Sequence, residues 1–223
     1  MLARLSTRAF ARAAAPMRAF SSADTALSSL LGRELAEEKA NCFVGEELET
    51  LREKVLKNFK ISDTPGNVGV TLRAKHANET IDINFNVQDV AEPEAGEYDD
   101  EEAEEEDAEY EGDEEDDVLP NIRFTARIVK NNQALIFDCV ASSILTIDSV
   151  MHLEENADEV DNSVYHGPRF IDLENDVQEA FADYLNERHI NDDLANFIME
   201  YADLKEQKEY VAFLENVQKF TEA

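Results

Sequence analysis

The sequence is poor in glycine, cysteine and positive charge. It contains seven glycines and two cysteines, and its 20 Lys or Arg stand against 51 Asp or Glu, which gives a formal net charge of −31. Two cysteines as far apart as Cys42 and Cys139 make no disulfide framework, so we expect both to be buried thiols in a reducing compartment. No apolar run approaches the roughly 20 residues of a membrane-spanning helix, so we predict no membrane span.

The motifs of the common enzyme classes are absent too. No glycine-rich phosphate loop, Cys-x-x-Cys pair, His-Glu-x-x-His motif or Gly-x-Ser-x-Gly elbow occurs. The histidines are scattered without the spacing of metal ligands, so we expect them to be structural or solvent-exposed. They are His76, His152, His166 and His189. We therefore predict no enzymatic activity, no cofactor and no metal site, with a hydrolase or metal enzyme of unrecognised type as the alternative.

The densest acidic stretch covers residues 92–117, between two predicted strands. Of its 26 residues 18 are Asp or Glu, none is Lys or Arg, and no aliphatic residue is larger than alanine. Such a stretch cannot offset its ordering entropy by burying apolar surface, so we predict a disordered loop. It is either a passive solubilising loop or, as we favour, a contact surface for basic partners. The predicted partner-binding residues are Asp99, Asp100, Glu101, Glu102, Glu104, Glu105, Glu106, Asp107, Asp113, Glu114, Glu115, Asp116 and Asp117.

The acidity extends beyond this tract. Without it, the chain still has 33 acidic residues against 20 basic ones, a net charge of −13. Such a surface repels nucleic-acid phosphates and anionic lipids, and it attracts basic proteins, cationic peptides and divalent ions. A second acidic stretch, residues 154–161, could bind calcium loosely. It lacks the ordered alternation and central glycine of an EF-hand loop, so we favour a solvated turn.

The first 20 residues differ in kind from the rest. They contain four arginines and no acidic residue, and three of the arginines recur every four residues. This basic, amphipathic pattern is typical of a mitochondrial transit peptide, whereas a secretory signal needs an uninterrupted apolar core. Because Arg18 lies three residues before Ser21, we predict cleavage after Phe20, which leaves one folded domain, residues 21–223, with a net charge of −35. A basic arm that binds nucleic acid or a membrane surface is the alternative.

Hydrophobic periodicity predicts helices at both ends of the folded part and strands between them. Apolar faces predict a first helix from Asp24 or Thr25 and a second over residues 46–59, with Gly45 as an interruption. The period then changes to two, and hairpin loops are expected at residues 77–79 and 131–132. The predicted strands cover residues 68–73, 81–90, 122–128, 134–140 and 144–153. Short connections favour an antiparallel sheet with one solvated face and one face that needs cover.

Two C-terminal helices are predicted to supply this cover. The first has Asp172 as its predicted cap and ends near His189, and the second runs from Asn191 or Asp192 to Phe220. Because the second helix is apolar over more than one stripe, we infer that part of it faces another chain. The predicted oligomer-interface residues are Phe197, Tyr201, Val211, Leu214 and Val217.

The C-terminal sequence also resembles a known family. The segments DYLNERHI at 183–190 and KEYVAFLENVQKF at 208–220 resemble the mitochondrial acidic matrix protein family, also called the mitochondrial glycoprotein family. Its animal members were also described as receptors for the globular heads of a complement component. The strand at 80–87, the acidic insertion and the strand at 134–139 fit the same pattern, so the resemblance covers roughly residues 25–221.

This resemblance implies an α+β fold: a twisted antiparallel sheet of about seven strands, one N-terminal and two C-terminal helices, and a ring-shaped homotrimer with an acidic face. It implies a non-enzymatic mitochondrial matrix protein that binds basic clients such as ribosomal proteins in a chaperone-like manner. That role supports mitochondrial ribosome assembly, translation and respiratory function, with weak or indirect RNA association in some members. The alternatives are a nuclear or cytosolic acidic histone chaperone and a low-affinity calcium buffer.

Overall fold

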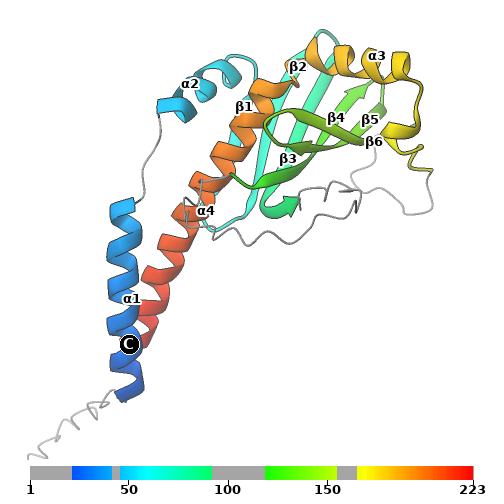
Figure 1. Ribbon diagram of the computed structural model, residues 1–223. Coiled ribbons are helices and arrows are strands. Elements are labelled where there is room, and N and C mark those ends of the chain that lie inside the picture. Colours follow the sequence, from blue (N-terminus) through cyan, green and yellow to red (C-terminus); the bar gives the residue numbers. More distant parts are fainter. Residues whose placement is uncertain (1–21, 42–45, 92–118, 155–164, 223) are drawn as a thin grey trace, which may run out of the picture.

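The computed structural model describes residues 22–41, 46–91, 119–154 and 165–222. The predicted transit peptide, the acidic tract at 92–117 and Cys42 lie outside these residues. The described elements form an α+β fold in which a sheet is flanked by N-terminal and C-terminal helices (Figure 1). In chain order they are α1 (Ser22–Asn41), α2 (Glu46–Val55), β1 (Lys60–Asp63), β2 (Gly69–His76), β3 (Glu79–Ala91), β4 (Asn121–Lys130), β5 (Gln133–Ala141), β6 (Leu145–Leu153), η1 (Phe170–Asp172), α3 (Asn175–Asn186) and α4 (Asp192–Thr221).

The sheet is an antiparallel meander in the order β1-β2-β3-β4-β5-β6. The five strands predicted from alternation are confirmed, and the described residues contain six strands instead of about seven. The additional strand, β1, has only four residues, too few to show a period of two. The predicted helix over residues 46–59 is four residues too long, because α2 ends at Val55.

Tight turns set the register of this sheet. Asn131 and Asn132 have φ angles of 51° and 64°, as a two-residue type I′ hairpin requires, so the predicted turn is confirmed. Ala77 also has a positive φ, of 52°, in the turn between β2 and β3. Glu79, which we placed in that loop, is instead the first residue of β3 and is only 4% exposed. A pattern of apolar residues cannot predict that a carboxylate is buried, so it did not assign Glu79 to the strand.

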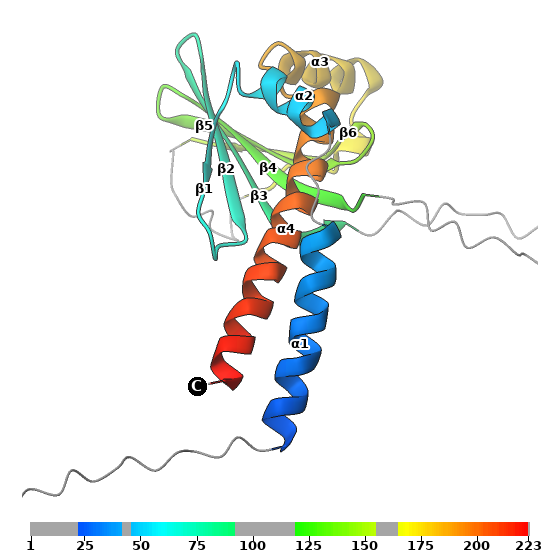
Figure 2. The ribbon, with the colours of Figure 1, turned by 90° about the vertical axis from the view of Figure 1, so that its left-hand side faces the viewer.

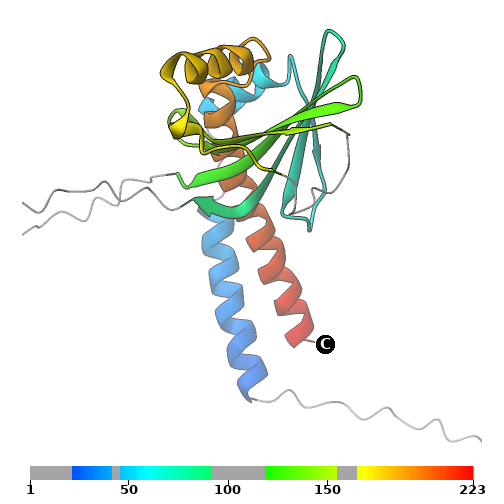
Figure 3. The same cartoon turned by 90° about the vertical axis from the view of Figure 1, so that its right-hand side faces the viewer.

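Alternation gives the sheet one buried face. Leu72, Ile83, Ala126 and Phe137 lie opposite one another on β2 to β5 and are fully buried. They share a core with residues of α2 and α4, including Phe197, and Figure 3 shows α2, α3 and the first half of α4 on one side of the sheet. Removing this apolar surface from water supplies the main driving force for folding.

The C-terminal helices begin at different residues with different caps. The side chain of Asn191 accepts a hydrogen bond from the Leu194 N–H, which confirms Asn191 as the cap of α4. The predicted cap of the preceding helix is wrong, because α3 starts only after Glu174. Asp172 lies in the short 3₁₀ helix η1, where its carboxylate pairs with Arg169, and the extended backbone of Leu173 separates η1 from α3.

The second half of α4 leaves the sheet and packs against α1. The two helices run side by side in opposite directions, away from the sheet (Figures 1 and 2). Lys39 of α1 pairs with Glu215 of α4 at 2.6 Å, and Ser28 near the start of α1 donates to Glu222 beyond the end of α4 at 2.7 Å. We inferred that the excess apolar surface of this helix faces another chain; within one chain, α1 already covers part of it.

Candidate binding surface

The helices and strands of the described part of the chain differ in charge, and we call the helices the helical layer, although α1 and the second half of α4 extend away from the sheet. The four α-helices carry 18 acidic and 7 basic residues, a net charge of −11, and α3 contains no basic residue. The six strands carry six acidic and six basic residues and are neutral. The helical layer is therefore a source of negative potential that attracts cations over a distance set by the ionic strength.

A row of polar side chains crosses the sheet on the face opposite the helices. It is defined by the strand register, one residue from each strand, and we call it the polar row. Its members are Ser62, Thr71, Asn84, Thr125, Asp138 and Ser149. Hydrogen bonds along the row hold the side chains in place: Thr71 donates to Asn84 at 2.9 Å. A hydroxyl or amide fixed in this way is a preorganised partner for a ligand.

Asp138 is the charged member of the polar row. Its two carboxylate oxygens accept hydrogen bonds from different strands, from Thr125 at 3.3 Å and from Ser149 at 2.8 Å. The register of β5 and β6 shifts beside it, because Asp138 pairs with Ser149 while Cys139 pairs with Ile147. The extra residue, Asp148, is exposed, and this β-bulge explains the imperfect alternation of the strand predicted at residues 144–153.

A groove of about 530 Å³ lies along the polar row. Its lining adds Asn67, Asn86, Asp89 and Arg123 to members of the row and to Asp148. Arg123 is held at one end, where Nη1 contacts Asp89 at 3.4 Å and donates to the Val90 carbonyl at 3.0 Å. With three carboxylates and one guanidinium, the groove lining carries a net charge of −2.

Two buried cations fasten the helices to the sheet. Arg188, which follows α3, forms two hydrogen bonds with Glu79 of β3, at 2.8 and 3.2 Å, and its guanidinium carbon lies 3.3 Å above the ring of Tyr184. Burial alone would raise the pKa of Glu79, but hydrogen bonds and charge from Arg188, with a smaller contribution from Lys130, lower it. Both side chains of this ion pair are buried, so the pair fixes the position of the C-terminal end of α3 relative to β3.

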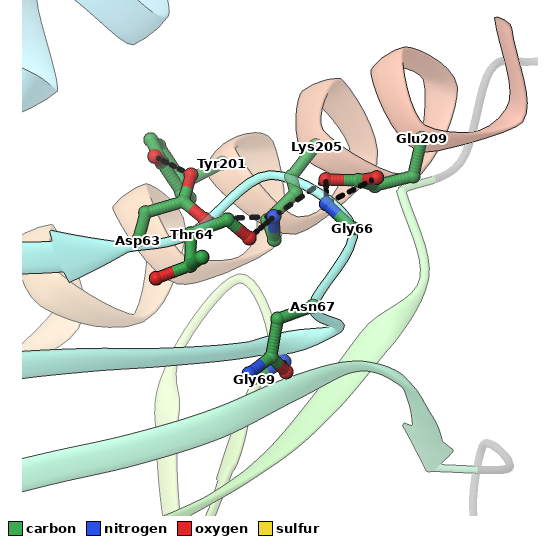
Figure 4. A network of polar contacts seen from close by, with 8 residues as sticks. All are labelled: Asp63, Thr64, Gly66, Asn67, Gly69, Tyr201, Lys205 and Glu209. Carbon is green, nitrogen blue, oxygen red and sulfur yellow. Dashed lines mark hydrogen bonds and ion pairs between the residues drawn. The ribbon is translucent and has the colours of Figure 1, made fainter. Parts of the chain in front are cut away.

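The second cation, Lys205 of α4, holds the turn between β1 and β2 (Figure 4). Its ammonium lies 2.7 Å from Asp63 and 3.0 Å from Glu209, and both oxygens of Glu209 accept from the Gly66 N–H. Burial would lower the pKa of Lys205, but hydrogen bonds and charge from Asp63 and Glu209 raise it, so the lysine stays charged. Tyr201 completes the network by donating to Asp63 at 2.7 Å.

The predicted acidic partner-binding residues, from Asp99 to Asp117, all lie outside the described residues. What the structure does place are the two ends of that segment. Ala91 at the end of β3 pairs with Asn121 at the start of β4, so both ends leave from the same end of the sheet. The predicted binding role of the tract itself stays a prediction.

The predicted interface residues fall into two groups. Phe197 and Leu214 are 0% and 3% exposed in a single chain, so their side chains belong to the interior of the chain itself. Tyr201, Val211 and Val217 are half-buried on α4. The oligomer interface as a whole stays a prediction, and the exposed apolar side chains of this region are others: Leu27, Leu30, Phe213 and Phe220.

Other candidate chemistry finds no site in the described part of the chain. No group of three His, Cys, Asp or Glu there could hold a metal ion, and no helix there is long and apolar enough to cross a membrane. Cys139 is a buried free thiol, as predicted. Burial, and then the charges of Asp138 and Asp148, raise its pKa far above the ordinary range, which makes it a poor nucleophile.

Sequence reasoning missed the polar row and its groove. The alternating pattern shows Thr71, Asn84 and Thr125 as outward-facing residues, but only the strand register brings them together. The sequence did not predict that Asp148 lies on the same face as the polar row, because the β-bulge interrupts the alternation of inward and outward residues in β6.

Comparison with known proteins identifies the chain. The model of a family described as mitochondrial glycoprotein matches residues 31–221. The chain belongs to this family. The chain is 35% identical to the mitochondrial acidic protein mam33 of Schizosaccharomyces pombe over 187 residues, which covers 73% of this chain and 68% of that protein. It is 29% identical over 167 residues to an uncharacterized mitochondrial protein of Arabidopsis thaliana, covering 74% of this chain and 62% of that protein.

Solved structures agree with this membership at the level of the fold. The p22 protein of Trypanosoma brucei has a TM-score of 0.67 at 23% identity and covers 90% of this chain and 100% of its own. A protein of Leishmania major, described as a sequence homologue of human p32, also has a TM-score of 0.67, at 19% identity, with coverage of 90% and 99%. Membership of this family supports the interpretation of the chain as a mitochondrial acidic protein.

Proposed function

We propose that this chain is a non-enzymatic protein of the mitochondrial matrix that binds basic proteins, such as ribosomal proteins, until they assemble with RNA. In this chaperone-like role it supports mitochondrial ribosome assembly, translation and thereby respiratory function. The observation that carries the proposal is the charge: −35 without residues 1–20, with −11 on the helical layer and no compensating excess on the sheet. Such a field concentrates basic proteins and repels free RNA.

The matrix location rests on the first 20 residues and on relatives whose names describe them as mitochondrial. A fusion of residues 1–20 to a fluorescent reporter should reach the matrix and lose the peptide after Phe20. Substitution of the four arginines in that segment by glutamine should leave the reporter in the cytosol. If the native fusion went to the nucleus or stayed cytosolic, an acidic histone chaperone would become the better interpretation.

Client capture is tested by affinity purification from matrix extract. The mature protein should recover proteins of high isoelectric point at about 0.1 M salt and release them well below 1 M, because exposed charges separated by more than a Debye length are screened. An uncharged bead and an unrelated acidic protein of similar charge serve as controls. Recovery of no basic proteins, or capture that is unchanged in molar salt, would contradict the proposal.

A homotrimer is part of the same proposal. Large apolar side chains remain exposed on α1 and on the second half of α4, among them Leu30 at 53%, Phe213 at 58% and Phe220 at 82%. Exposed apolar surface of this kind marks a contact site for another protein surface. Sedimentation of the mature protein should give three times the mass of one chain, and Phe213→Ser with Phe220→Ser should shift it toward the monomer. A monomeric native protein would contradict this part of the proposal.

A further inference from the structure

The proposed function rests on the net charge of the protein and assigns no role to the groove along the polar row. It lies on the sheet face opposite the acidic helical layer, and its walls come from β2 to β6 together with the turn before β2. Thr71 on β2 and Asp148 on β6 both line the groove, and their strands are separated by four strand spacings, or about 19 Å. That length accommodates about six residues of extended polypeptide at roughly 3.3 Å each.

The charge of the groove selects the sign of its occupant. Arg123 is engaged by Asp89 and by the Val90 carbonyl at one end of the groove. The partners of Asp138 are two neutral hydroxyl groups, and no ion pair to this carboxylate occurs among the described residues. Its hydrogen bonds therefore orient its negative charge and do not neutralise it, which favours a cationic side chain at this point.

The remaining residues of the lining favour a peptide over a single-stranded nucleic acid. Phe85 and Phe124 contribute to the walls, but their rings point into the core and are only 4% and 3% exposed. A single-stranded nucleic acid therefore finds no ring on which a base could stack, and its phosphates meet a net negative groove. Asn67, Asn84 and Asn86 instead offer amide groups that can donate to and accept from a peptide backbone.

We propose that this groove binds an extended segment of a basic protein, with Asp138 and Asp148 pairing with its lysine or arginine side chains and the asparagines bonding its backbone. This inference rests on the proposed function and adds the contact site to it. The helical layer attracts the client over a distance, and the groove holds one strand-like segment of it.

The test uses the full mature chain and a fluorescent nine-residue peptide of alternating lysine and serine, with a glutamate–serine peptide as the negative control. The double variant Asp138→Asn with Asp148→Asn should raise the Kd, measured by fluorescence anisotropy, at least tenfold. The matched variant Asp176→Asn with Asp183→Asn removes the same charge from exposed positions on α3 and should change the Kd less than twofold.

A second variant guards against a folding defect in the first. Asn84→Lys places a cation at an exposed position in the middle of the polar row and should also raise the Kd at least tenfold, with an unchanged circular dichroism spectrum. A photoreactive copy of the lysine peptide should cross-link to β2 to β6. Cross-links confined to residues 92–117 or to the helices would contradict the proposal that the groove is the binding site.

The outcomes separate this inference from the function on which it rests. If the native protein fails to bind the lysine peptide at all, the proposed capture of basic clients and the groove fail together. If it binds but the groove and α3 variants weaken binding equally, the client is held by the overall field alone. In that case the groove proposal fails, and the proposed capture of basic proteins remains.

Discussion

At the scale of single residues, the few buried cations show how a strongly acidic chain keeps its helices in place. The side chains of Arg188 and Lys205 are 8% and 5% exposed, and each pairs with a carboxylate from the sheet or its turns. Neither position was predicted from the sequence to be buried, because a buried cation cannot be distinguished from a surface one until its partner is known. Their partners, Glu79 and Asp63, lie 109 and 142 residues away in the chain.

Breaking the deeper of these pairs should be costly. Arg188→Met leaves the Glu79 carboxylate buried with only the more distant Lys130, at 3.5 Å, and should lower the free energy of unfolding by about 3 kcal/mol. Urea denaturation at fixed protein concentration measures the change. The double variant Glu79→Gln with Arg188→Met should recover part of the loss, and a single variant as stable as the native chain would contradict the role of the pair.

Acid should weaken the same contacts. Hydrogen bonds from Lys205 and from the Gly66 N–H lower the pKa of Glu209, and the pKa values of Glu79 and Asp63 are lowered as well. Because the folded values lie below the unfolded ones of about 4, this stabilisation is present above the unfolded values and is lost as the pH falls through the lowered values. Glu209→Gln should therefore show a shallower loss of unfolding free energy between pH 5 and pH 3. A slope equal to that of the native chain would contradict the assignment.

At the scale of elements, two glycines in connecting segments have backbone conformations that favour glycine. Gly66 and Gly167 have nearly equal φ angles, 80° and 79°, but different surroundings. A Cβ on Gly66 would have no atom within 4 Å, whereas a Cβ on Gly167 would lie 2.3 Å from the carbonyl oxygen of Val150. Gly66 lies in the turn between β1 and β2, and Gly167 lies between β6 and η1.

This pair separates conformational strain from steric clash. Gly66→Ala should cost about 1 kcal/mol of unfolding free energy, since alanine disfavours a positive φ. Gly167→Ala should cost about 3 kcal/mol, because β6 or the segment before η1 must also shift. Thermal and urea unfolding of the two variants measure the difference. Equal losses would show that the Val150 contact relaxes without cost.

At the scale of the whole molecule, the acidic tract is an insertion between two paired strands. Since Ala91 and Asn121 already lie opposite each other, a short turn can replace residues 92–117 without separating β3 from β4. We expect this deletion to leave folding and oligomeric state unchanged and to weaken capture of basic proteins several-fold. Circular dichroism, sedimentation and the matrix pull-down measure these properties. Loss of the fold would show that the tract is a structural part of the domain.

Much of the architecture could be predicted from the sequence because it follows from local periodicity. Alternation located five strands, two asparagines located a type I′ turn, and Asn191 marked the start of α4. The short strand β1 and the true start of α3 could not be found, because four residues show no period and the extended backbone of Leu173 has no sequence signal. The family followed from the order of these parts and from the C-terminal segments.

The sequence by itself determined the sign and size of the charge, the meander of strands and the absence of enzyme motifs, since these depend on composition and near neighbours. Only the tertiary structure decided where the charge of the described elements lies, on the helices and not on the strands. It alone brought one polar residue from each of six strands into a row beside a groove, and it alone showed Phe197 to be core. Strand register and helix docking are long-range choices, made by the packing of side chains that are distant in the chain.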